Sequence, residues 1–229
     1  MEFLDSIPQR ILELSLVALK RANTDSIFRD RGKEHHATLA PISTAHAGEL
    51  LLKALIAQVH PLLIFENLHQ LKPSQKISKE WLENYGKTHN FDRLPTILKA
   101  TTNIDIPDMN SFRNLQRVRN QIQHFLEPDE DPTEICIDFI YNNIDPLLYE
   151  HFDESACEFH EDQFDDYVIA FLIESEIKFS LPTKLEMPEF GESGLNGLLR
   201  GCSPEYRTWL SNELSLRNVD HLRYPPNKP

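Results

Sequence analysis

The fold class that the sequence predicts is all-α. Two long segments, residues 45–66 and 109–126, carry apolar side chains at the three- and four-residue spacing of one helix face. Glycine is scarce, with 7 residues, so a collagen-like chain and a glycine-rich linker are excluded. The hydrophobic share of 40% and the charged share of 26% are typical of a globular protein with a packed core.

Residues that are suited to the start of a helix predict the first two helices. Ser6 is a suitable N-cap, and Pro8 falls in the first turn, where its missing N–H donor does no harm. Residues 24–41 are polar and are expected to form a loop or a frayed helix end. Ser43 or Thr44 can then cap the second, longer helix.

The later helices are bounded mainly by prolines and polar residues. Pro61 is expected to kink or break the second helix, because it has no backbone N–H donor. Residues 167–179 fit either a helix or a buried strand, since the run is too short for its periodicity to separate the two. A last helix is expected from Ser203 to near Arg217. The other expected helices cover 78–85, 92–100, a segment from Asp108 or Asn110 to Leu126, and 133–152.

The charge is distributed unevenly along the chain. The formal net charge is −13, yet residues 1–126 carry +3 and residues 193–229 carry +2. Residues 127–192 hold 20 acidic and 2 basic residues. A strongly acidic protein is unsuited to broad, non-specific duplex binding, which depends on neutralising phosphates. A small basic site in the first half remains compatible with this distribution.

The cysteines and the apolar runs indicate a cytoplasmic protein. The cysteines lie far apart and form no C-x-x-C pair, so a zinc ribbon, a thioredoxin motif and a disulfide framework are not expected. The first apolar run follows acidic residues, whereas a signal peptide begins with basic ones. The longest apolar run, 50–65, is interrupted by polar residues and falls short of the roughly 20 residues that a membrane span needs. The cysteines are Cys136, Cys157 and Cys202.

The segment 109–127 holds the residues best suited to chemistry. On a helical wheel of about 100° per residue, one face is apolar and is expected to contact the core. The opposite face carries arginines that can hold a phosphate, an amide, and an imidazole that can move a proton. The apolar face consists of Phe112, Leu115, Val118, Ile122, Phe125 and Leu126. The polar face consists of Arg113, Arg117, Asn120 and His124.

Arg119 has a different position on the same wheel. It lies at the edge of the apolar arc, roughly 140° from His124. One isolated helix therefore does not aim both side chains at one point. Either Arg119 folds over the helix, or a second copy of the helix completes the site.

Residues 119–124, with the sequence RNQIQH, resemble the R-x4-6-H motif of HEPN-domain proteins, in which a polar residue such as Asn120 follows the arginine. Residues 45–66 are similar to the long early HEPN helix, and residues 88–98 resemble the segment that often follows it. The order of helices matches over roughly residues 5–152. We therefore expect a HEPN-like helical domain over 1–152 and an acidic C-terminal extension of unknown role over 153–229.

The resemblance implies a metal-independent endoribonuclease that needs no cofactor and acts as a toxin or antiphage effector. His124 would be the general base or acid, Arg119 would bind the scissile phosphate, and Asn120 would orient either of them. Arg113 and Arg117 would contact the RNA substrate. HEPN domains generally pair as homodimers whose motif helices form a composite cleft. An antitoxin or a defence-system protein would be a further partner, and no membrane association is implied.

Two alternatives to catalysis stay open. The protein could be a HEPN-like interaction module without activity, in which the acidic segment docks a basic partner and the arginines of 109–127 form ordinary surface ion pairs. A nucleotide-binding accessory domain has less support, because no phosphate-binding loop is present. Glu49 and Lys53 form an i,i+4 pair that either stabilises a helix or reaches into the cleft.

Two further patterns are interpreted as non-functional. A second match to the motif, Arg29 with His35 or His36, contains Gly32 and lies in an expected loop. A group of potential metal ligands after residue 150 matches no zinc pattern and is interpreted as a solvated acidic face. That group comprises His151, Glu154, Cys157, Glu158 and His160.

Overall fold

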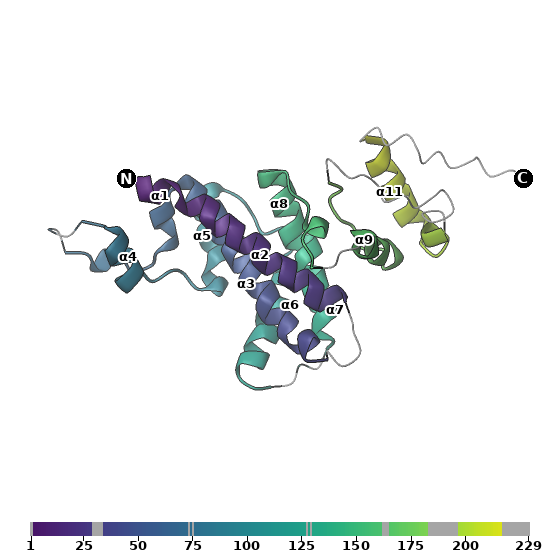
Figure 1. Ribbon diagram of the computed structural model, residues 1–229, viewed down its shortest axis with the longest axis horizontal. Coiled ribbons are helices and arrows are strands. Elements are labelled where there is room, and N and C mark those ends of the chain that lie inside the picture. Colours follow the sequence, from purple (N-terminus) through teal and green to yellow (C-terminus); the bar gives the residue numbers. More distant parts are fainter. Residues whose placement is uncertain are drawn as a thin grey trace, which may run out of the picture.

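The described part of the protein is helical (Figure 1). The structure is a computed structural model that describes residues 2–28, 34–72, 74, 76–126, 128, 130–161, 165–182 and 197–216. Within these ranges no strand forms, and one isolated antiparallel bridge joins Phe65 to Thr88. The predicted all-α class is confirmed. No helix in these ranges is long and apolar enough to cross a membrane.

The chain between α3 and α4 forms two 3-10 turns, whereas α5 and α6 follow one another closely. The longest helix is α3, which Pro61 ends as predicted. Short 3-10 turns occur at Pro61–Ile64, Leu68–Gln70, Phe91–Arg93 and Ala156–Glu158, and a π-helical turn spans Ile140–Ile144. The α-helices are α1 (Glu2–Asp5), α2 (Ile7–Ile27), α3 (Glu34–Val59), α4 (Lys79–Tyr85), α5 (Leu94–Thr102), α6 (Met109–Gln123), α7 (Pro132–Phe139), α8 (Asp145–Phe152), α9 (Asp165–Glu174) and α11 (Pro204–Leu216).

Helix α3 is the centre of the bundle. It packs along α2 and also contacts α5, α6 and α7. Small residues allow this close packing: a Cβ atom added at Gly48 would lie 2.7 Å from Cε1 of Phe139 in α7. The buried hydroxyl of Ser15 in α2 donates a hydrogen bond of 2.9 Å to the carbonyl of Ala47. α3 is therefore enclosed on several sides, and its apolar residues form the main core.

Three phenylalanine rings join the helices on which the candidate site depends. The ring centroids of Phe91 and Phe112 are 4.5 Å apart, and those of Phe112 and Phe139 are 6.0 Å apart. All three side chains are buried. Burial of a phenylalanine side chain contributes about 1.5–3 kcal/mol, so this cluster firmly attaches the 91–93 turn to α6 and α7.

The prediction that residues 24–41 form a loop or a frayed helix end is wrong for 24–27 and 34–41, which are helical. α2 continues to Ile27 and α3 already begins at Glu34, so Pro41 lies inside a helix. Thr44 is buried within α3 and does not cap it, and Ser43 lies in the same helix. Burial of Ala40 against the core compensates for the weak local helix signal. The second motif match, Arg29 onward, falls largely outside the described residues.

The prediction that Phe125 and Leu126 belong to the core is also wrong. α6 ends at Gln123, and the two side chains are 97% and 60% exposed. The reason is that the chain leaves the helical path at His124, so the wheel no longer applies to the residues after it. The earlier members of the predicted apolar face, Phe112, Leu115 and Val118, are buried as expected.

In the second half of the chain, the last expected helix forms, and the expected helix over 133–152 is divided in two. Residues 132–152 are continuously helical, but the π-helical turn separates α7 from α8 just before Pro146, which cannot donate to the helix ladder. The segment 167–179 is mostly helical, since α9 runs to Glu174. The last helix forms as α11. Ser203 precedes it and donates its backbone N–H to Glu176 across 2.7 Å.

The first part of the C-terminal extension is attached to the bundle. The amide of Asn23 in α2 donates to the carbonyls of Ala156 and Phe159, at 2.8 and 2.9 Å. The buried carboxylate of Asp145 accepts hydrogen bonds from the backbone N–H groups of Ala156 and Ser180, at 2.8 and 2.6 Å. Two buried polar side chains of the bundle therefore hold three points of the extension.

Candidate functional site

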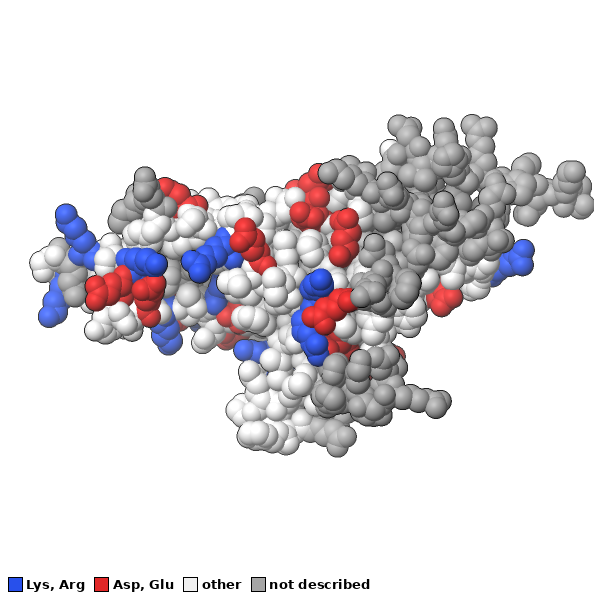
Figure 2. Space-filling model, viewed as in Figure 1, with Lys and Arg blue, Asp and Glu red and all other residues white. Residues whose placement is uncertain are grey.

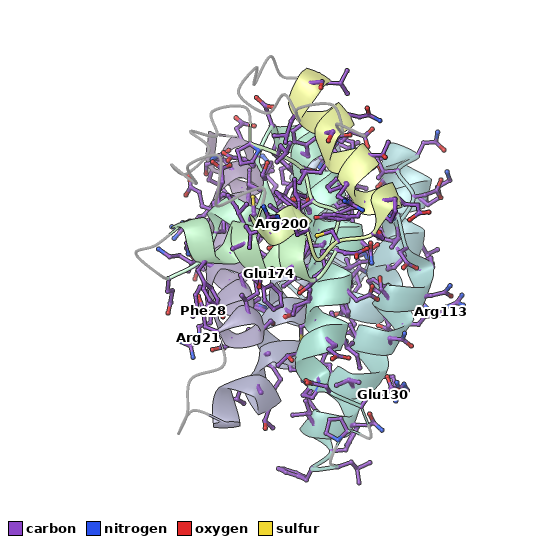
Figure 3. The ribbon with its side chains drawn as sticks, turned by 90° about the vertical axis from the view of Figure 1, so that its right-hand side faces the viewer. Arg21, Phe28, Arg113, Glu130, Glu174 and Arg200 are labelled. Carbon is purple, nitrogen blue, oxygen red and sulfur yellow. The ribbon has the colours of Figure 1, made fainter. Side chains whose placement is uncertain are left out.

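The polar face of α6 is exposed, as the helical wheel predicts. Asp108 caps the helix start, with its Oδ1 accepting from the backbone N–H of Asn110 at 2.8 Å. Arg113, Asn120 and His124 are exposed to solvent. Figure 3 shows Arg113 and Glu130 along one edge of the molecule, opposite the edge that holds Arg21 and Phe28. This face is therefore accessible in the described structure.

Arg117 forms the kind of surface ion pair that the non-catalytic alternative expects. Its Nη2 atom lies 3.0 Å from Oε1 of Glu130, and both side chains are about half exposed. Such exposed pairs contribute only about 0–1 kcal/mol, because solvent screens them. The pair neutralises one of the predicted substrate contacts but can open at little cost.

Arg119 is held differently from the other arginines of α6. It is partly buried, and its Cζ atom lies 6.0 Å from the ring centroid of Phe91. A cation over an aromatic face is attracted by about 0.5–2 kcal/mol. Among the described residues the guanidinium has no carboxylate within ion-pair distance. Its N–H donors are thus positioned by the core and remain available to an anion such as a phosphate.

A buried ion pair supports the segment that carries Phe91. The Nζ atom of Lys53 in α3 lies 2.6 Å from Oε1 of Glu49 and donates to Oγ1 of Thr88 at 2.9 Å. Lys53 is only 7% exposed. The pair therefore does more than stabilise a helix, since it connects α3 to the chain just before the 91–93 turn. Both polar groups of Lys53 and Thr88 are satisfied by this contact.

His89 lies next to this pair, although the sequence alone favours its interpretation as a capping or surface histidine. Its side chain is 21% exposed, and its Nδ1 atom is 4.0 Å from Oε2 of Glu66. Partial burial lowers the pKa of His89, Arg93 and Lys53 lower it further, and Glu66 opposes the shift. Partial burial thus favours the neutral form of the imidazole over the charged form.

His124 occupies the C-cap of α6. Its backbone N–H donates to the carbonyl of Asn120 at 3.0 Å, while its side chain is exposed. Arg119 packs against Phe91 and His124 faces solvent, and no hydrogen bond joins their side chains. The structure thus brings Arg119 to the 91–93 turn but does not bring it to His124. Within the described ranges, no group of three or more His, Cys, Asp or Glu residues could hold a metal ion.

Comparison with known proteins identifies no relative of this chain. No protein-family model matches the chain, and no curated protein or solved structure matches it. The interpretation of the site therefore depends on the residues of α6 and on the geometry around Phe91.

Proposed function

We propose that the protein is a metal-independent endoribonuclease of HEPN type. The observation that supports this most is the guanidinium of Arg119, which the ring of Phe91 positions and which has no carboxylate partner in the described structure. The exposed side chains of Asn120 and His124 lie on the same helix, one and five residues further on. An anion site and a proton-transfer group are the two elements that RNA cleavage by a neighbouring hydroxyl requires.

In the proposed reaction the ribose 2′-hydroxyl attacks the adjacent phosphorus atom. His124 removes the proton of that hydroxyl or protonates the departing 5′-oxygen, which an imidazole does well near neutral pH. Arg119 stabilises the negative charge that develops on the phosphate oxygens. Asn120 orients the imidazole or the phosphate. The bond between phosphorus and the 5′-oxygen breaks, leaving a 2′,3′-cyclic phosphate and a 5′-hydroxyl.

The active form in this proposal is a homodimer. Arg119 and His124 are held apart on one helix, because the former packs against Phe91 and the latter is exposed at the helix end. A two-fold axis between two copies of α6 would place Arg119 of each copy near His124 of the other. Such an enzyme would serve as a toxin or antiphage effector, restrained by an antitoxin or a defence-system partner.

The direct test is cleavage of a labelled oligoribonucleotide in the presence of EDTA. We expect the wild-type chain to leave products with a cyclic phosphate, and His124→Ala to leave the RNA intact. His46→Ala is the matched control, since His46 is an exposed histidine on α3. Cleavage by His124→Ala at the wild-type rate would contradict the assignment of His124.

An interaction module without activity is the second candidate, and one observation favours it. A cavity of about 830 Å³ lies between α7 and the end of α9, and its charged wall residues are Glu134, Asp138, Glu176 and one cation, Lys178. These carboxylates suit a basic segment of a partner protein. In that case expression of the wild-type chain would not arrest growth. A ribonuclease would arrest growth, and Arg119→Ala or His124→Ala would relieve the arrest.

A further inference from the structure

The residue after His124 is a phenylalanine with an almost fully exposed ring. Phe125 is 97% exposed and is the most exposed large apolar side chain among the described residues. Leu126 beside it is 60% exposed. In Figure 1 this end of α6 protrudes at the bottom of the molecule, away from the body of the bundle. The two side chains lie next to each other and are accessible to a binding partner.

The backbone holds this ring in a defined place. The N–H of Leu126 donates to the carbonyl of Gln121 at 2.9 Å, and the N–H of Phe125 donates to that of Ile122 at 3.0 Å. These two bonds close the helix in a Schellman motif and put Phe125 at a φ of 61°. Glycine is the usual residue there, because a side chain strains the left-handed conformation. The turn itself therefore gives no reason for an aromatic ring.

The surroundings of the ring suit a nucleic acid strand. From residue 109 to residue 126 the chain has three arginines and no acidic residue, and the acidic residues begin at Glu127, directly after Leu126. In Figure 2 the described part of the bottom tip shows no charged side chain, and both basic and acidic side chains lie above it. A strand that places a phosphate at Arg119 or Arg113 can place a base against an apolar tip. Inside a duplex both faces of each base are covered, so a base away from the strand ends must be unpaired to stack there.

We propose that Phe125 is a stacking platform for an unpaired base next to the scissile phosphate, so that the enzyme selects single-stranded RNA. This inference rests on the proposed ribonuclease function. It makes Phe125 a specificity-determining residue, whereas His124 and Arg119 perform the chemistry. A second copy of the chain that covers Phe125 is the competing occupant, and the experiment distinguishes the two.

The experiment measures the binding of the full chain to a 2′-O-methyl 12-mer, which cannot be cleaved by 2′-hydroxyl attack. Fluorescence anisotropy compares the single strand with the duplex of the same sequence, for wild type, Phe125→Ala and Phe125→Tyr. Tyr85→Ala is the matched control, because Tyr85 is an exposed aromatic residue at the end of α4. Light scattering on each variant reports the oligomeric state, and cleavage of the unmodified RNA strand is assayed in parallel.

We expect Phe125→Ala to weaken single-strand binding about 5- to 150-fold, the range that loss of base–aromatic stacking produces. Duplex binding should change less than about twofold, and Phe125→Tyr should bind like wild type because it keeps the ring. If Phe125→Ala binds the single strand as tightly as wild type, the inference about Phe125 is overturned. If both chains still cleave the unmodified RNA, the ribonuclease proposal is upheld. A wild-type dimer that Phe125→Ala converts to monomer would assign Phe125 to the interface between copies instead. A wild type that neither binds nor cleaves RNA would overturn both proposals.

Discussion

Arg119 lies over the ring of Phe91, with its guanidinium carbon 6.0 Å from the ring centroid. Phe91 itself is buried and stacks on Phe112, which belongs to the same helix as Arg119. The aromatic cluster of the core therefore determines where this guanidinium is. The other arginines of α6 extend into solvent, so Arg119 is the arginine of this helix whose position is determined by packing against the core.

The first prediction concerns this position. Arg119→Ala should reduce the rate of RNA cleavage by about 10²–10³-fold, the typical cost of removing one donor that stabilises transition-state charge. Arg119→Lys should not restore the rate, because an ammonium group cannot form the paired donor geometry of a guanidinium. Rates are measured on a labelled oligoribonucleotide. Arg10→Ala, an exposed arginine on α2, is the control and should cleave like wild type.

The second prediction concerns the composite site. Arg119→Ala and His124→Ala should each be inactive alone, yet their mixture should regain about one quarter of the wild-type activity once subunits exchange. Half of the dimers in the mixture contain both variants, and each of these dimers has one intact site. Gel-based cleavage assays after mixing measure the recovery. Continued inactivity of the mixture, with exchange shown by differently tagged chains, would place both residues of a site in one copy.

The third prediction compares a buried with an exposed ion pair. Lys53→Met should lower the free energy of unfolding by about 3 kcal/mol, because it leaves Glu49 without its partner in a poorly solvated place. Lys79→Met removes an i,i+4 pair with Glu83 whose side chains are both more than 60% exposed, and should cost less than about 0.5 kcal/mol. Urea unfolding followed by circular dichroism measures both. Equal effects would mean that burial of Lys53 adds nothing to its pair.

The fourth prediction tests how the extension is attached. Asp145→Ala should lower the free energy of unfolding by about 3 kcal/mol, since the N–H groups of Ala156 and Ser180 lose a charged acceptor. Asp105→Ala is the control, because Asp105 is 75% exposed and pairs only with Lys99 at the surface. Limited proteolysis should also cut the variant sooner after residue 152. A variant as stable as Asp105→Ala would show that these two bonds do not hold the extension.

The fifth prediction concerns pH. Burial raises the pKa of Asp145 above its ordinary value of 3.8, although the bonds from Ala156 and Ser180 oppose the shift. The folded protein therefore takes up this proton before the unfolded chain does. The resulting contribution to stability is fully present below pH 3.8 and is lost as the pH rises through the raised pKa of the folded state. The difference in free energy of unfolding between wild type and Asp145→Ala should therefore increase as the pH falls from 7 toward 4.

Much of the fold could be predicted because its helices carry local signals. The apolar spacing of α3 and α6 and the stop at Pro61 each depend on residues within a few turns of one another. The end of α6 could not be predicted, because Phe125 occupies a left-handed position where glycine or asparagine is the usual signal. The apolar stripe also continued through Leu126. A helical wheel assigns such residues to the core unless the helix is known to have ended.

Local sequence patterns were enough to predict the all-α class, the helix that carries Arg119, Asn120 and His124, and the edge position of Arg119 on that helix. These follow from the 3.6-residue period, which is a local property of the chain. The three-dimensional arrangement was needed to show that Arg119 packs over Phe91, that Lys53 reaches Thr88, and that the ring of Phe125 is exposed. The physical reason is that such contacts join segments distant along the chain, and the packing of whole helices creates them.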